Sequence, residues 1–245
     1  MGEAMTARTV QITGHLGDPV EAYLVRPEGD DPRGGVVVIH HMPGFDRATK
    51  EMTRRFADLG YDAICPNLYS REAPGAAPDD AAAVARASGG VPDARLIGDV
   101  AAAAAHLRAL PSSNGKVGVI GYCSGGRQSV LAACNLVLDA AVDCYGAFVT
   151  GAPPAGSMRP NLVDQLPNLR APLLGLFGVQ DAHPSPEEVT ELDQILTAAD
   201  KAHEFHSYDE AAHAFFAVDR PSYRVAAAND GWDKIADFFG THLRG

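Results

Sequence analysis

The chain has 245 residues, with 20 Lys and Arg against 31 Asp and Glu, so its formal net charge is −11. This acidic balance argues against a nucleic-acid-binding surface, which needs clustered basic residues. With 46% hydrophobic and 21% charged residues, the composition is that of a soluble globular protein, and the length fits one domain over residues 1–245 with a large core.

The N-terminus and the cysteines bear on location. The first ten residues lack the basic and apolar segments of a secretory signal. The sequence contains no run of about 18 apolar residues, which a membrane-spanning helix would need. The four cysteines show neither the paired C-x-x-C spacing of a zinc site nor the density of a disulfide scaffold. They are Cys65, Cys123, Cys134 and Cys144. We expect a cytoplasmic protein with reduced thiols, no membrane association and no bound metal.

The predicted elements begin with two alternating segments, 9–13 and 20–26, typical of an antiparallel strand pair with one solvated face. Continuous apolar runs then predict buried parallel strands over 35–40, 61–65, 116–121, 139–144 and 173–177, with a last strand over 203–208. Amphipathic patterns predict helices over 48–59, 94–110, 125–134, 186–199 and 223–243. This order indicates an α/β protein with a mostly parallel, twisted sheet of about eight strands and helices on both faces.

Two long loops interrupt the alternation of strands and helices. Residues 71–93 are rich in Ala, Pro, Gly and Asp, and residues 146–171 are rich in Gly, Pro and Asn. Both follow strands at their carboxyl ends, where open α/β sheets bind ligands, so they are candidates for the roof of a pocket. The alternative interpretation is that both loops are surface excursions without a role in binding.

The segment VGVIGYCSGG over 117–126 is the most informative one for function. A strand ends in the pattern G-x-Cys-x-G, formed by Gly121, Cys123 and Gly125, and a helical pattern follows. This is the arrangement of a nucleophile elbow, in which small flanking residues make room for a strained strand-to-helix turn. The helix N-terminus favours a thiolate there. We therefore predict Cys123 as a nucleophile, the alternative being a small buried cysteine in a tight turn.

The chain resembles the dienelactone hydrolase family of α/β-hydrolases along almost its whole length. The matching motifs are VVVIHHMPGF at 36–45, FADLGYDAICPNLY at 56–69, GYCSGG at 121–126, LFGVQD at 176–181, and AAHAFF at 211–216 with RPSY at 220–223. The resemblance implies the α/β-hydrolase fold, an acyl-hydrolysing activity through a Cys-Asp-His triad, and no metal or organic cofactor.

The acid and the base follow the nucleophile in the order that this fold requires. Asp181 comes after the strand at 173–177, and LFGVQD matches the acid position of the family. His213 follows the last strand, and AAHAFF matches the catalytic-histidine motif. Backbone N–H groups of Met42 and Ser124 are the candidate donors to the carbonyl oxygen of a substrate.

Two positions depart from the family pattern. The family commonly has a glutamate where this chain has His41, so we predict His41 as a candidate modulator of the thiol or a contact for substrate, with a pocket wall as the alternative. The family also has an arginine where this chain has Ala217. Arg71, Arg127 and Arg159 could supply a local basic cluster for such an anion, but each of them is expected at the surface. Together with the charge of −11, this favours an uncharged or unidentified ester over the anionic substrate of the family's namesake.

The sequence thus predicts a hydrolase of small carboxylic esters or lactones that acts through Cys123, His213 and Asp181. Thioesters, aryl esters and phosphotriesters are alternative substrates for the same residues. An α/β-hydrolase-like binding protein without catalysis is the alternative from another class. The expected partner is a small molecule, and the chain is expected to be a monomer or a homodimer.

Overall fold

The computed structural model describes residues 4–153, 155, 157 and 159–244. Eight strands form one sheet in the order β1-β2-β4-β3-β5-β6-β7-β8. The strands are β1 (Met5–Thr13), β2 (Pro19–Pro27), β3 (Arg33–Ile39), β4 (Asp62–Pro66), β5 (Ser113–Tyr122), β6 (Ala140–Cys144), β7 (Leu173–Gly178) and β8 (His203–Tyr208). All eight strands expected from the sequence are present, so the strand prediction is confirmed.

The pairing of the strands also agrees with the sequence patterns. β1 pairs antiparallel with β2, and β2 pairs antiparallel with β4. The remaining neighbours, from β4 through β3, β5, β6 and β7 to β8, are all parallel. The alternating segments therefore form the antiparallel edge, which can have one solvated face. The continuous apolar runs form the parallel strands, which are buried on both faces.

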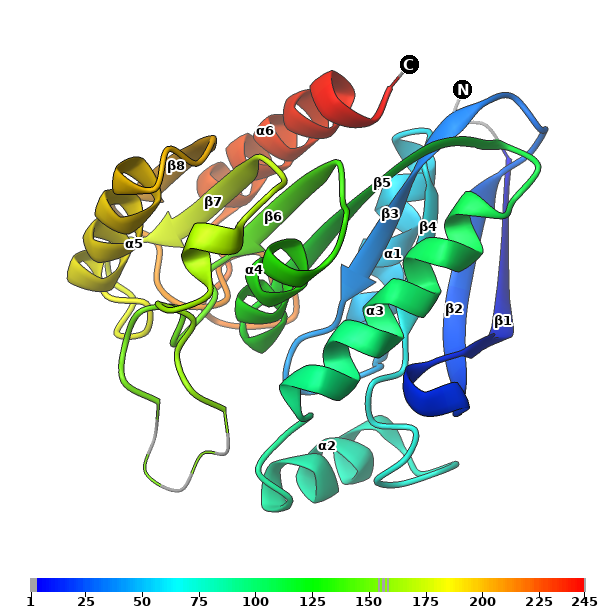
Figure 1. The fold of residues 1–245 in the computed structure, drawn as a ribbon, viewed down its shortest axis with the longest axis horizontal. Coiled ribbons are helices and arrows are strands. Elements are labelled where there is room, and N and C mark those ends of the chain that lie inside the picture. The colour runs from blue at the N-terminus through cyan, green and yellow to red at the C-terminus, as the bar shows by residue number, and fades with distance from the viewer. Residues whose placement is uncertain (1–3, 154, 156, 158, 245) are drawn as a thin grey trace.

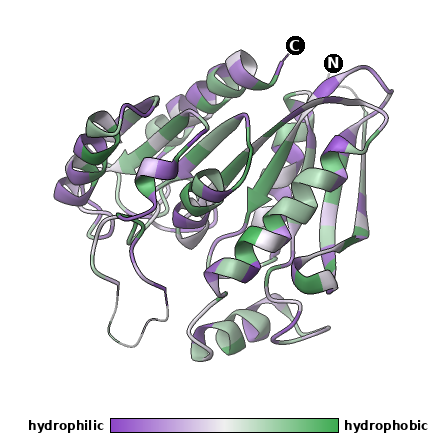
Figure 2. Ribbon diagram, in the orientation of Figure 1, coloured by the Kyte–Doolittle hydropathy of each residue, from purple (hydrophilic) through white to green (hydrophobic). Residues whose placement is uncertain are grey.

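Helices cover both faces of the sheet (Figure 1). The long helices are α1 (Arg47–Asp58), α3 (Asp93–Arg108), α4 (Ser124–Asn135), α5 (Pro186–Ala198) and α6 (Val225–Leu243). One core cluster lies between the sheet and α3, α4 and α5, and a second lies between the sheet and α1 and α6. Figure 2 shows the central strands as hydrophobic, while hydrophilic residues alternate along the outer helices.

The interpretation of residues 71–93 as a loop without regular structure is wrong in part. Helix α2 (Pro78–Ala87) lies within it, and three alanines of that helix are buried. Pro78 stands at the start of the helix and two aspartates lie in its first turn, which are ordinary helix-start signals. The buried face of α2 consists of alanines, so the helix lacks the large apolar residues that mark the other helices in the sequence.

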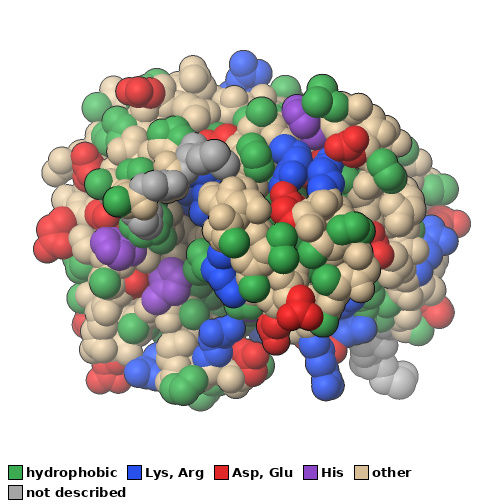
Figure 3. Space-filling view, turned by 90° about the horizontal axis from the view of Figure 1, so that it is seen from below, with side chains coloured by type: hydrophobic (Ala, Val, Ile, Leu, Met, Phe, Trp, Pro, Cys, Tyr) green, Lys and Arg blue, Asp and Glu red, His purple; other side chains and the backbone are tan. Residues whose placement is uncertain are grey.

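Both long loop regions lie at the carboxyl edge of the parallel strands, at the bottom of Figure 1. Residues 154, 156 and 158 of the 146–171 loop lie outside the described residues. Seen from this side, the molecule is hollowed near its middle, with basic side chains around the hollow (Figure 3). Within the described part of the chain, no helix is both long and apolar enough to span a bilayer. One domain over residues 1–245 stays a prediction.

Candidate active site

Cys123 occupies a strained turn between β5 and α4. It immediately precedes α4 as the N-cap residue, with φ +58°, a left-handed conformation that is rare outside glycine and is associated with functional sites. A Cβ atom on Gly121 would overlap the carbonyl oxygen of Gly125, and one on Gly125 would overlap that of Ile39. Both glycines are therefore required by close backbone contact, which is the geometry of a nucleophile elbow.

His213 and Asp181 lie together beside this turn. Asp181 follows β7 and is 7% exposed, and its Oδ2 lies 2.7 Å from Nδ1 of His213. The other carboxylate oxygen accepts a hydrogen bond from the backbone N–H of His183 at 2.9 Å. This second bond holds the carboxylate in place, so the imidazole is oriented with its other nitrogen free for the thiol of Cys123.

The thiol and the imidazole shift each other's ionisation. Burial alone would raise the pKa of Cys123, but a hydrogen bond and the charge of His213, with the backbone N–H groups of Ser124 and Met42, lower it. Burial alone would lower the pKa of His213, but hydrogen bonds to Asp181 and Cys123 raise it to about 10. Both directions favour a thiolate paired with an imidazolium at neutral pH.

The same N–H groups of Ser124 and Met42 were predicted as donors to a substrate carbonyl oxygen. Each of these N–H groups hydrogen-bonds the sulfur of Cys123, and the two bonds help to lower the pKa of the thiol. Ser124 is the first residue of α4, and Met42 lies in the loop between β3 and α1. The structure thus brings together five predicted residues at one edge of the sheet. Their catalytic roles stay predictions.

His41, the candidate modulator of the thiol, lies in the same loop as Met42. Its Nε2 is 2.8 Å from Oδ2 of Asp46, which also caps α1 by accepting from the N–H of Thr49. Burial opposes ionisation of Asp46, but these hydrogen bonds lower its pKa to about 2. His41 therefore has a carboxylate partner of its own, and its effect on the thiol stays a prediction.

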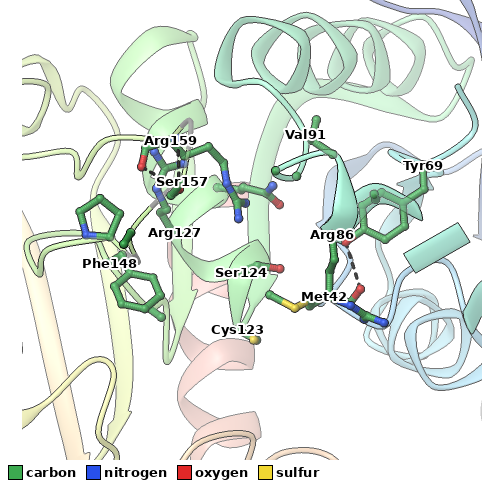
Figure 4. Close-up of a pocket in the computed structure, with 17 residues that line it drawn as sticks. Met42, Tyr69, Arg86, Val91, Cys123, Ser124, Arg127, Phe148, Ser157 and Arg159 are labelled. Carbon is green, nitrogen blue, oxygen red and sulfur yellow. Dashed lines mark hydrogen bonds between the residues drawn. The ribbon is translucent and has the colours of Figure 1, made fainter. Parts of the chain in front are cut away.

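A cavity of about 310 Å³ opens over Cys123. Its lining includes Tyr69 after β4, Arg86 and Val91 from the 71–93 region, and Phe148 and Arg159 from the 146–171 loop. Figure 4 shows Cys123 and Ser124 between the segments that carry Arg159 and Arg86. Both long loop regions thus line the cavity. Within the described residues, no group of three His, Cys, Asp or Glu is arranged to hold a metal ion.

The expectation that the arginines are surface residues is wrong for two of the three. Arg127 is 3% exposed and donates two hydrogen bonds to Asp93, each 3.0 Å long. Arg159 lines the cavity, and its Nε is buried with no hydrogen-bond partner among the described residues. Arg71 is half-buried and pairs with Asp99 and Asp18. The net charge therefore did not reveal a local basic site.

Three cavity or site residues were not identified from the sequence. The ring of Tyr145 packs edge-on against His213, with centroids 5.2 Å apart. The hydroxyl of Tyr69 donates to the carbonyl of Met42 at 3.0 Å. Arg86 lies on the unpredicted helix α2. Tyr145 directly follows β6 and Tyr69 comes three residues after β4, both at the carboxyl ends of strands, and that position was the available signal.

This sheet, with a cysteine elbow after β5, an acid after β7 and a histidine after β8, defines an α/β-hydrolase. The sequence matches the model of the dienelactone hydrolase family over residues 20–243. The chain therefore belongs to the dienelactone hydrolase family, and the resemblance seen in its motifs is confirmed.

Relatives and solved structures agree with this assignment. A protein of Escherichia coli K12 with the name "Putative carboxymethylenebutenolidase" is 37% identical over 233 residues, covering 91% of this chain and 83% of that protein. The carboxymethylenebutenolidase of Pseudomonas putida is 30% identical over 224 residues, covering 88% and 89%. The crystal structure of a "Putative Dienelactone Hydrolase" from Klebsiella pneumoniae superposes with a TM-score of 0.87 at 32% identity, covering 98% and 100%.

Proposed function

We propose that the protein hydrolyses small carboxylic esters or lactones, with Cys123 as nucleophile, His213 as acid and base, and Asp181 as the group that orients His213. One observation carries this proposal. The sulfur of Cys123 contacts His213 and two backbone N–H groups at a strained elbow, and His213 is held by Asp181 at 2.7 Å. The proposed nucleophile, base and oxyanion donors can thus act on a single carbonyl group, while the acid orients the base from behind.

The reaction follows from these contacts. The thiolate of Cys123 attacks the carbonyl carbon, and the negative charge moves to the carbonyl oxygen, which the N–H groups of Met42 and Ser124 stabilise. The tetrahedral adduct collapses, the C–O bond to the leaving group breaks, and the imidazolium of His213 protonates the departing alkoxide. His213 then takes a proton from water, which attacks the acyl-cysteine, releasing the carboxylic acid and regenerating the thiolate.

The cavity favours an ester that carries a carboxylate. Arg86 and Arg159 line it, and neither forms a salt bridge among the described residues. Arg127 already has Asp93 as a partner, so the two other guanidinium groups are the available ones. A guanidinium binds a carboxylate through charge-assisted hydrogen bonds. We therefore replace the uncharged ester inferred from the net charge by an acidic ester or lactone.

The same residues could also hydrolyse phosphotriesters or thioesters. One solved structure with a TM-score of 0.79, at 23% identity and covering 98% and 100% of the two chains, is a dienelactone hydrolase-like promiscuous phosphotriesterase from metagenomic libraries. A thiolate nucleophile is also suited to thioesters. Comparing ester, thioester and phosphotriester turnover by one preparation ranks these substrates.

The direct test is hydrolysis of 4-nitrophenyl acetate by the wild type and by Cys123→Ala and Cys123→Ser variants. We expect turnover by the wild type, an acetyl adduct on Cys123 detected by mass spectrometry of a quenched reaction, and loss of both in Cys123→Ala. Unchanged turnover in Cys123→Ala would reject this nucleophile. Failure of the wild type to turn over any ester, lactone or thioester would favour a binding protein.

A further inference from the structure

We propose that His40 is a positioning residue that aims the N–H group of Met42 at the reacting carbonyl oxygen. The inference rests on the proposed function, because it assigns Met42 to the oxyanion hole. His40 follows β3 directly, is 2% exposed, and lies outside the residues that touch the cavity. Its side chain is nevertheless hydrogen-bonded to the backbone of the loop that carries Met42.

The hydrogen bonds of His40 determine which of its nitrogens carries the proton. The backbone N–H of Leu68 donates to Nε2 at 3.2 Å, so Nε2 is an acceptor. Nδ1 lies 2.9 Å from the carbonyl oxygen of His41 and must therefore donate to it, because a carbonyl offers no proton. Burial lowers the pKa of His40 to about 4, which keeps the ring neutral and this arrangement intact at neutral pH.

The bond to the His41 carbonyl sets the direction of the Met42 N–H, since both belong to one planar peptide. In a trans peptide the C=O and N–H bonds point in opposite directions. The carbonyl of His41 accepts from Nδ1 of His40 and also from the N–H of Gly44 at 2.9 Å. With the oxygen held on that side by two donors, the Met42 N–H is directed to the other side, where it faces the sulfur of Cys123.

A second contact holds Met42 on its far side. The hydroxyl of Tyr69 donates to the carbonyl oxygen of Met42 at 3.0 Å, and this bond is drawn in Figure 4. Burial raises the pKa of Tyr69 to about 12, so the hydroxyl keeps its proton. The rings of His40 and Tyr69 pack edge-on, with centroids 4.6 Å apart. The two side chains therefore support each other while each binds one of the peptides next to Met42.

The end of β3 is also fixed against the elbow itself. A Cβ atom on Gly125 would approach the carbonyl oxygens of Ile39 and His40 too closely, so these backbones are in direct contact. The segment that holds His40 thus has a defined position relative to the first turn of α4 and to Ser124. Because oxyanion donors stabilise the transition state only when they are already in place, this support should appear in kcat.

Two substitutions separate the two hydrogen bonds of His40. In His40→Asn, the amide nitrogen can occupy the place of Nδ1 and donate to the His41 carbonyl, while the bond from Leu68 is lost. In His40→Gln, the amide reaches the place of Nε2 and can accept from Leu68, while the bond to His41 is lost. We expect His40→Gln to lower kcat roughly tenfold or more with KM within about twofold. His40→Asn should stay within about threefold of the wild type.

The readouts distinguish orientation from damage to the fold. Thermal unfolding reports folding, and alkylation of Cys123 by iodoacetamide, which needs no oxyanion hole, reports an intact nucleophile. Equal kcat values in the folded Gln and Asn variants would overturn the positioning role. If both variants fail to fold, Tyr69→Phe decides. A severalfold loss of kcat with 4-nitrophenyl acetate at unchanged KM is expected, and an unchanged kcat would overturn the proposal. Absence of wild-type turnover would instead overturn the proposed function.

Discussion

The imidazole Nδ1 of His213 is hydrogen-bonded at 2.7 Å to Oδ2 of the buried carboxylate of Asp181. The bond fixes both the tautomer and the direction of the ring, so its loss should affect the reaction more than the fold. For Asp181→Asn we expect kcat for 4-nitrophenyl acetate to fall roughly 10²-fold or more. The matched control is Asp193→Asn, which removes the charge of an exposed carboxylate on α5 that is hydrogen-bonded to His203. Similar kcat values for the two variants would contradict the assignment of the acid.

The ionisation of Cys123 can be followed directly by alkylation. Because His213 and two backbone N–H groups lower the thiol pKa, the wild type should react with iodoacetamide at pH values below the ordinary thiol pKa of 9.0. In His213→Ala the effect of burial remains while the largest compensating contacts are lost. The reactivity profile should therefore move to higher pH. Cys123→Ala gives the background from the three buried cysteines, and a profile unchanged by His213→Ala would contradict the ion pair.

Removing His41 tests whether it modulates the thiol. The Asp46 carboxylate, whose pKa is about 2, would lose its imidazole partner in His41→Ala. An uncompensated negative charge in the loop next to Cys123 disfavours the thiolate, so we expect the apparent pKa of alkylation to rise. The double variant His41→Ala/Asp46→Asn keeps a capping side chain on α1 and should restore the wild-type value. Identical profiles in wild type and His41→Ala would rule out this role.

Arg159 should select for an acidic substrate. Charge-assisted hydrogen bonds contribute about 1.5–3 kcal/mol, so Arg159→Met should lower kcat/KM for 4-acetoxybenzoate roughly tenfold and leave that for its methyl ester nearly unchanged. Arg8→Met, which removes an exposed arginine of β1, controls for the change in net charge. Equal effects of Arg159→Met on the acid and on its ester would contradict a carboxylate-binding role.

The neutral ring of His40 should make the protein sensitive to acid. Its pKa is lowered from 6.5 to about 4 by burial, so the unfolded chain takes up a proton at a higher pH than the native protein. The stability this neutral ring contributes is complete above pH 6.5 and decreases as the pH falls towards 4.

Because of this difference in pKa, we expect protonation of His40 to lower the free energy of unfolding by about 3 kcal/mol at pH 4. Urea unfolding of wild type and His40→Asn at pH 7 and pH 4 measures it, because the neighbouring side chains of His41 and Asp46 are present in both proteins. Between pH 7 and pH 4, His40→Asn should lose less of its free energy of unfolding than the wild type, and the difference should be about 3 kcal/mol. An equal loss in the two proteins would contradict a buried neutral His40.

The family, the strand order along the chain and the elbow could be predicted because each depends on a local pattern. Apolar runs indicate buried strands, and the spacing of Gly121, Cys123 and Gly125 meets a steric need that the close backbone contacts at this turn explain. Helix α2 was missed because alanines form its buried face. Composition favoured an uncharged substrate, but a net charge contains no information about where single arginines lie, and Arg86 and Arg159 line the cavity.

The sequence by itself determined the α/β class, the family, and the types and order of the candidate catalytic residues, because strands, turns and motifs depend on neighbours along the chain. Only the tertiary structure decided which groups meet across it. It paired His41 with Asp46 and Arg127 with Asp93, left Arg159 facing the cavity, and linked His40 to the Met42 peptide. These contacts join loops that follow different strands, and only the folded sheet brings the loops to one edge.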